Sequence, residues 1–213
     1  MYDPTSHLGL VSRAVRNFER DGKPAKAVIA QATYDTDVAD LWDALTNPAR
    51  LPRWFLPVEG ELRLGGRYQF IGNAGGTVTE CVPLKKIGAT WEGGGNVSWV
   101  TLTLTPEGER TRLELEHVAL VDPNFPPFGP GAVGVGWELG LLGLAVHLET
   151  AGAAIDPREG ASWPTTPEGK QYIRASSTGW GDADIAAGEE PSKARAGAEM
   201  TRQFYTGETP PTR

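Results

Sequence analysis

The sequence predicts an α+β domain in which a curved antiparallel β-sheet wraps around one long C-terminal helix. Two observations support this class. Between Glu59 and Leu120, apolar and polar residues alternate with a period of two, which is typical of antiparallel strands with one face in water. Residues 132–154 then form an apolar run with almost no polar face, and a helix of that kind must be covered on most of its circumference.

The composition is that of an ordinary globular protein. The chain has 213 residues, of which 39% are hydrophobic and 22% charged, so we expect one domain with extensions. The net charge is −7 and no segment clusters Lys and Arg as phosphate binding requires, which argues against nucleic acid as a partner. The N-terminus lacks the apolar run of a signal peptide, and Glu138 and His147 interrupt the apolar run near the end of the domain. We therefore expect a cytoplasmic protein without a membrane span.

We divide the chain into an N-terminal extension (residues 1–24), a main domain (25–154) and a C-terminal helical extension (155–213). The N-terminal extension is polar and weakly patterned, with a short helix expected around Leu10–Phe18. In the C-terminal extension, Thr166-Pro167-Glu168 predicts a helix start and Gly188 its end. Pro191 predicts a second helix start and Gly207 its end. We expect these helices to form a hairpin that docks on the main domain or on a second subunit, which would give a homodimer.

The main domain begins with a predicted strand, residues 26–34, followed by two short helices. The first helix has apolar residues at the spacing of one buried face and can be capped by Asp35 or Thr36. Asn47-Pro48 ends this helix, and Pro57 ends the next one. The apolar faces consist of Val38, Leu41, Trp42 and Leu45 in the first helix and Leu51, Trp54 and Phe55 in the second.

Alternation assigns faces to the strands that follow. Residues 72–76, Gly-Asn-Ala-Gly-Gly, predict a hairpin turn because glycine and asparagine tolerate positive φ. The same alternation predicts which side chains turn inward: Val78, Glu80 and Val82 in one strand, Val100, Leu102 and Leu104 in another, and Leu113, Leu115, His117 and Ala119 in the last.

Several short segments occur in an order shared with a known superfamily: VADLWDALT at 38–46, RWF at 53–55, GGRYQF at 65–70, GTVTE at 76–80, TW at 90–91, TRL at 111–113 with His117, and GW at 136–137. Over residues 26–154 the chain resembles the SRPBCC superfamily, which includes START domains and polyketide cyclases. Within it, the chain is similar to the branch named for the activator of the 90-kDa heat-shock-protein ATPase. The resemblance implies a helix-grip fold with a cavity between sheet and helix that often holds lipids, hormones or polyketides.

Such a cavity would be lined by aromatic and aliphatic side chains with few polar groups. Glu80 and His117 are the candidate polar anchors or, in an enzyme, the candidate acid and base; alternatively they form a buried pair that satisfies itself. The aromatic residues can equally be plain core. The predicted apolar lining comprises Trp54, Phe55, Tyr68, Phe70, Trp91, Leu102, Leu115, Trp137 and Leu141.

Three functions follow from this reading. The first is a carrier or sensor of an apolar or amphipathic small molecule. The second is a cyclase- or aromatase-type enzyme that uses Glu80 and His117. The third is a chaperone-interacting or dimerising protein that works through its surface, with a filled core.

The sequence predicts no cofactor and no metal. The three histidines are scattered and Cys81 is the only cysteine, so no zinc-binding spacing exists, and no Ser–His–Asp pattern stands on a nucleophile elbow. The predicted long helix contains four glycines, which leave space facing the sheet or permit close packing: Gly134, Gly136, Gly140 and Gly143.

Overall fold

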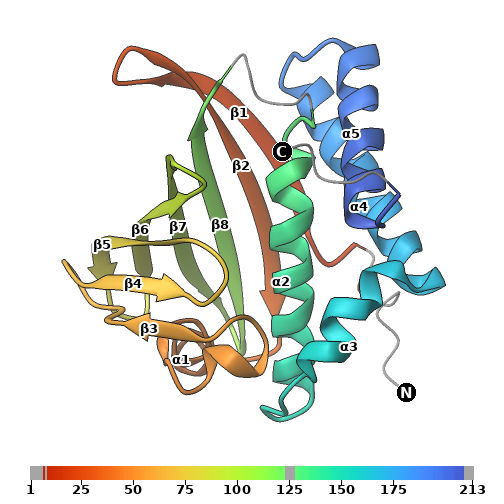
Figure 1. Cartoon of the computed structure of the whole chain (residues 1–213). Helices are drawn as coiled ribbons and strands as arrows, with labels where there is room; N and C mark the ends of the chain where they lie inside the picture. Colours follow the sequence, from red (N-terminus) through yellow and green to blue (C-terminus); the bar gives the residue numbers. More distant parts are fainter. Residues whose placement is uncertain (1–6, 8, 123–127, 209–213) are drawn as a thin grey trace. The chain divides into compact units, whose positions relative to one another are not determined.

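The computed structural model describes residue 7, residues 9–122 and residues 128–208, and it confirms the α+β class (Figure 1). Eight strands form one sheet in the order β1-β2-β8-β7-β6-β5-β4-β3. The strands are β1 Ser12–Arg20, β2 Lys23–Tyr34, β3 Val58–Gly60, β4 Arg67–Phe70, β5 Gly75–Val82, β6 Lys86–Gly93, β7 Asn96–Glu107 and β8 Arg110–Leu120. The helices are α1 Val38–Thr46, η2 Leu51–Arg53, α2 Gly131–Glu149, α3 Pro157–Ser162, η3 Trp163–Thr165, α4 Pro167–Ala186 and α5 Pro191–Tyr205.

The chain contains two compact units, each built from segments that are separated in the sequence. The strand unit comprises residues 31–119 and 143–155. The helical unit comprises residues 1–30, 120–142 and 156–213. The N-terminal strand and the C-terminal helices thus belong to the same compact unit. The division of the sequence into three parts at residues 24 and 154 stays a prediction.

Within the strand unit, antiparallel pairing confirms the predicted faces of β7 and β8. Leu102 pairs with Leu115, and Leu104 with Leu113. Leu104, Leu113 and Leu115 are buried, whereas Thr103, on the opposite face, is only half-buried. The predicted turn at residues 72–76 is also confirmed, since β4 ends at Phe70, β5 begins at Gly75, and Gly72 has a φ of +76°.

A bulge in β5 overturns part of the predicted face assignment. The register with β6 shifts between Val78, which pairs with Ala89, and Glu80, which pairs with Gly88. The extra residue reverses the alternation that follows. Val78 is 1% exposed, as predicted, but Val82 is 44% exposed. Cys81, which the alternation placed on the outer face, packs against the core instead.

Two helices of the helical unit begin and end where the sequence predicted. Thr166 caps α4 through a hydrogen bond from the Gly169 amide to its hydroxyl, and Glu190 caps α5. Gly188 follows α4 and Gly207 follows α5, both with positive φ. The two helices pack against each other, which confirms the hairpin (Figure 1). Whether they also contact a second copy of the chain stays a prediction.

The helix predicted for the N-terminal segment is wrong. The residues expected to form a helix, Leu10–Phe18, lie mostly in strand β1. β1 packs against α4, and the Asn17 side chain donates a hydrogen bond to the Ala187 carbonyl. β1 also pairs with β2 in the sheet, across a turn in which Asp21 and Gly22 both have positive φ. Asp-Gly favours such a hairpin turn, so the sequence contains a local signal for this strand that the helix prediction overlooked.

Close packing occupies the positions of three glycines in α2. A Cβ at Gly134 would lie 2.2 Å from Cε2 of Trp180, and one at Gly136 would lie 2.7 Å from Oη of Tyr205. In the strand unit, a Cβ at Gly143 would lie 2.6 Å from the Trp54 carbonyl oxygen. Of the two readings the sequence left open, close packing therefore holds for these three positions.

By length and composition, α2 is a helix that could cross a membrane, although a buried core helix passes the same test. A core role is favoured by Glu138, which is fully buried. Arg13 of β1 donates Nε and Nη2 to the two Glu138 carboxylate oxygens, at 2.6 and 2.7 Å. The pair satisfies both charges inside the helical unit, which is the condition for burying an ionised side chain.

Removing one partner of this ion pair should destabilise the helical unit more than removing both. For Glu138→Ala we expect the free energy of unfolding to fall by about 3 kcal/mol, because Arg13 is left largely buried and unpaired. The double variant Arg13→Met/Glu138→Leu should recover most of that loss. Urea unfolding followed by circular dichroism measures both values. A double variant less stable than the single variant would contradict this account.

Candidate functional site

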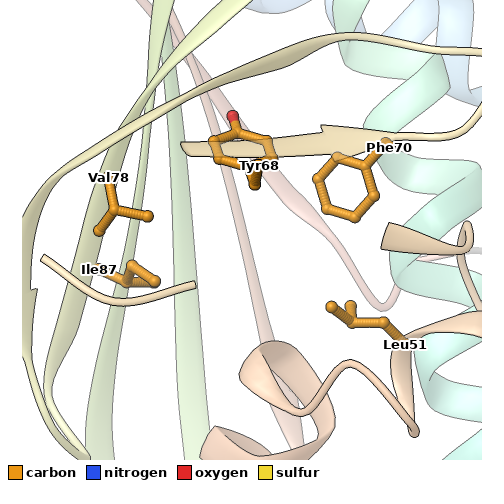
Figure 2. Close-up of a cluster of buried hydrophobic side chains, with 5 residues drawn as sticks. All are labelled: Leu51, Tyr68, Phe70, Val78 and Ile87. Carbon is orange, nitrogen blue, oxygen red and sulfur yellow. The ribbon is translucent and has the colours of Figure 1, made fainter. Parts of the chain in front are cut away.

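The strand unit contains a hydrophobic cluster at the heart of the predicted lining. Its buried members come from η2, β4, β5 and β6 and turn toward a common interior: Leu51, Tyr68, Phe70, Val78 and Ile87 (Figure 2). Partly buried side chains pack around them: Trp42, Trp54, Phe55, Leu56, Val58, Leu62, Cys81, Ala89, Trp91 and Leu102. Six of the predicted lining residues therefore belong to one cluster or its margin.

Four aromatic side chains form a continuous series of ring contacts, which we call the aromatic row: Trp54, Phe55, Phe70 and Trp91. Successive ring centroids are 5.5, 5.2 and 5.6 Å apart. Phe70 meets Phe55 nearly edge to face, an arrangement that aromatic pairs favour. The row brings together rings from the segment after η2 and from strands β4 and β6.

The row is only partly covered. Trp54, Phe55 and Trp91 are half-buried, although Phe70 in their midst is buried. Leu102 is also half-buried, while Val100 and Leu104, its neighbours on the same face of β7, are buried. Part of the apolar surface of these side chains is therefore accessible.

His117 lies at the end of the aromatic row, 6.3 Å between ring centroids from Trp91. Its side chain is buried, and this desolvation lowers the pKa of His117 to about 4, so the imidazole is neutral at pH 7. Its Nε2 lies 2.8 Å from the hydroxyl of Ser98, which itself donates to the Trp91 carbonyl oxygen at 3.1 Å. Which of the two atoms donates in the contact between His117 and Ser98 depends on the tautomer of the imidazole.

The predicted pairing of Glu80 with His117 is wrong. The bulge in β5 turns Glu80 to the outer face, where its side chain is 46% exposed and lies 2.8 Å from the Lys86 ammonium group. A Cβ on Gly88 would contact both Glu80 and Thr101, which places Glu80 on the same face as Thr101. The inward-facing imidazole therefore lies beside Ser98 and not beside Glu80.

The remaining predicted lining residues fall into two groups. Tyr68 and Leu115 are buried in the strand unit, where the Tyr68 hydroxyl donates to the Thr90 carbonyl at 2.6 Å. Burial, with a smaller contribution from the charge of Glu92, raises the pKa of Tyr68 to about 12. Trp137 and Leu141 lie in the part of α2 that belongs to the helical unit, so their place in the lining stays a prediction.

The sequence reading missed a cleft of about 480 Å³ at one end of the strand unit. It is lined by Gly72, Asn73, Ala74, Trp91, Gly93, Gly94, Asn96 and Ser98. Trp91 thus belongs both to the cleft and to the aromatic row, and Ser98 joins the cleft to His117. The run of glycine and asparagine in both turns was the available signal, but it predicts turns and not which turns meet.

Within the described residues, no three side chains of His, Cys, Asp or Glu are grouped so that they could hold a metal ion. What the site offers is an apolar aromatic surface and neutral hydrogen-bonding groups.

Comparison with solved structures gives the chain clear relatives. The solution structure of CalU16 from Micromonospora echinospora is 30% identical, with a TM-score of 0.68, over 83% of this chain and 96% of CalU16. DynU16, a protein in the dynemicin biosynthetic locus, is 25% identical with a TM-score of 0.52, over 60% of this chain and 48% of DynU16. MLL2253 from Mesorhizobium loti is 23% identical with a TM-score of 0.53, over 58% of this chain and 97% of its own, and shows the fold alone. No curated protein matches the chain.

The family model described as Activator of Hsp90 ATPase homolog 1-like protein matches residues 35–149, more than half of the chain. That range contains the aromatic row, Ser98 and His117, and it runs to the last residue of α2. The expected helix-grip fold agrees with the likeness to CalU16 over almost its whole length. The chain belongs to the Activator of Hsp90 ATPase homolog 1-like family of the SRPBCC superfamily.

Proposed function

We propose that this protein binds an apolar or amphipathic small molecule against the aromatic row and acts as its carrier or sensor. The observation that carries this proposal is the half-exposure of Trp54, Phe55, Trp91 and Leu102 on the inward side of the strand unit. Planar rings cover a flat or flexible apolar ligand at little cost in side-chain entropy. The family, whose relatives include DynU16 from a biosynthetic locus, supports a lipid, a polyketide or an aromatic compound as the ligand class.

Ser98 and His117 provide the polar end of this binding surface. Both are uncharged at neutral pH, so an apolar ligand can approach them without desolvating an ion. The Ser98 hydroxyl has one hydrogen and two lone pairs, so its contacts with His117 and the Trp91 carbonyl leave at least one lone pair for a ligand hydroxyl. We assign these residues an orienting role.

The arrangement favours binding over catalysis of the cyclase or aromatase type. That alternative needed Glu80 beside His117 as a second proton-transfer group, and Glu80 is on the outer face. A neutral histidine whose pKa lies near 4 is also a weak base at neutral pH. A carrier or sensor needs neither property.

Truncating Trp91 should weaken binding of an apolar probe. We expect N-phenyl-1-naphthylamine, an uncharged fluorescent compound, to bind the wild-type protein, and Trp91→Ala to lower its affinity about tenfold, or about 1.4 kcal/mol, because a central ring of the row is lost. Fluorescence titration measures the affinity. Native mass spectrometry of the purified protein would look for a co-purified ligand in parallel.

Trp163→Ala is the matched control for this experiment. Trp163 is also half-buried and packs on an aromatic neighbour, Tyr172, but it lies in the helical unit. The control variant should bind the probe as the wild type does, with both variants folded by circular dichroism. Equal affinity of Trp91→Ala and wild type, or no binding at all, would remove the basis of the proposal.

Burial of neutral His117 should make the protein less stable in mild acid. Between pH 6.5 and pH 4 the unfolded chain protonates this histidine but the folded protein does not, so the free energy of unfolding falls as the pH is lowered. The full effect is up to about 3 kcal/mol. Urea unfolding at pH 7 and pH 4.5 should show a smaller loss for His117→Gln, which keeps a neutral donor. Identical losses in the two proteins would show that His117 is not buried in its neutral form.

A further inference from the structure

The cleft at the end of the strand unit forms where two hairpin turns meet. The turn between β4 and β5 and the turn between β6 and β7 are brought together by the pairing of Gly75 with Glu92. A Cβ on Gly93 would lie 3.5 Å from the Cβ of Ala74, which shows how closely the turns approach. The cleft volume of about 480 Å³ lies within the range of small-molecule sites, which is about 300–1,000 Å³.

The cleft has polar walls without charge. None of its eight lining residues has an ionisable side chain, and two of them are asparagines. The Asn73 side chain is used within its own turn, where its oxygen accepts the Ala74 amide. The side-chain amide of Asn96 makes no hydrogen bond to any other described residue. Its nitrogen can therefore donate two hydrogen bonds to a ligand, and its oxygen can accept others. Gly72 and Gly94 have positive φ and leave their backbone uncovered.

Trp91 connects this polar cleft to the apolar surface. It lines the cleft, and its ring contacts Phe70 in the aromatic row. Ser98, directly opposite Trp91 in the β6–β7 ladder, also lines the cleft. One ligand could therefore lie with its apolar part on the row and its polar part in the cleft.

The residues that line the cleft determine which polar group of a ligand can bind there. An ionic group in the cleft would lose hydration without meeting an opposite charge, because the nearby carboxylate of Glu92 is engaged by Arg67 and Thr90. A saturated ring with several hydroxyls fits better, because its C–H face packs on an indole while its hydroxyls reach amide and hydroxyl groups at the rim.

We infer that the cleft between the two turns is a subsite for an uncharged, hydroxylated ring, such as a sugar, that forms the polar end of an amphipathic ligand. This inference rests on the proposed function, since the apolar part of the ligand occupies the aromatic row. Trp91 stacks against the ring, and Asn96 and Ser98 hydrogen-bond to its hydroxyls. A glycoside and a polyhydroxylated carbocycle share this chemistry.

A series of eight-carbon amphiphiles tests the inference on the full chain, below the concentrations at which they form micelles. The probes are octyl β-glucoside, an octyl ether of myo-inositol, octyl hexaethylene glycol ether, octyl sulfate and octylamine, with affinities measured by calorimetry. We expect at least one of the two hydroxylated-ring probes to bind at least fivefold more tightly than the other three. The better of the two identifies the source of the ring.

Two variants locate the binding. Asn96→Ala should weaken the preferred ring probe at least fivefold and reduce its advantage over octyl sulfate. Asn17→Ala, an exposed asparagine on β1 of the helical unit, is the matched control and should leave all affinities unchanged. N-phenyl-1-naphthylamine binding to the wild type reports separately on the aromatic row.

The outcomes separate the two proposals. A preference for a ring probe that depends on Asn96 supports the subsite. If the naphthylamine binds but all five amphiphiles bind alike, or if Asn96→Ala has no effect, the subsite is overturned and the proposed function stands. If neither the naphthylamine nor any amphiphile binds, both are overturned.

Discussion

The register between β6, β7 and β8 is the constraint on which the site depends. Pairing of Trp91 with Ser98 and of Val100 with His117 puts Trp91, Ser98 and His117 on one face within two residues of each other along the strands. Because alternate residues share a face, a slip of one position would turn these side chains toward water. The contacts between His117, Ser98 and Trp91 are therefore set by backbone pairing and need no special loop.

Much of this arrangement could be predicted because apolar and polar residues alternate strictly along two of the strands. β7 and β8 alternate without interruption, so the inward positions of Leu102, Leu115 and His117 follow from the sequence alone. β5 differs because one extra residue near Thr79 reverses the faces that follow. No glycine or other distinctive residue marks that bulge, so simple alternation placed Glu80 inward and an acid–base pair was predicted that the fold does not form.

Contacts distant in sequence explain what else could not be predicted. Capping and turn residues mark the ends of α4 and α5 in the local sequence, and both helices were predicted correctly. The Asp21-Gly22 turn joins β1 to β2 and is a local signal, but the packing of β1 on α4 could not be predicted. The glycines of α2 could either leave open space or permit close packing, and only their tertiary contacts decide between the two. Trp180 and Tyr205 fill the space at Gly134 and Gly136, and neither contact can be inferred from the composition of α2.

The two units bury polar groups in different ways. The helical unit buries ions in compensated pairs, such as Arg13 with Glu138 and Lys26 with Asp184, whose charged atoms are 2.6 Å apart. Such pairs fix a geometry, because separating them leaves an uncompensated charge. The inward face around Ser98 has a neutral imidazole and a hydroxyl instead. Neutral groups can exchange a water molecule for a ligand hydroxyl at small electrostatic cost, which is the property that the proposed binding role requires of this face.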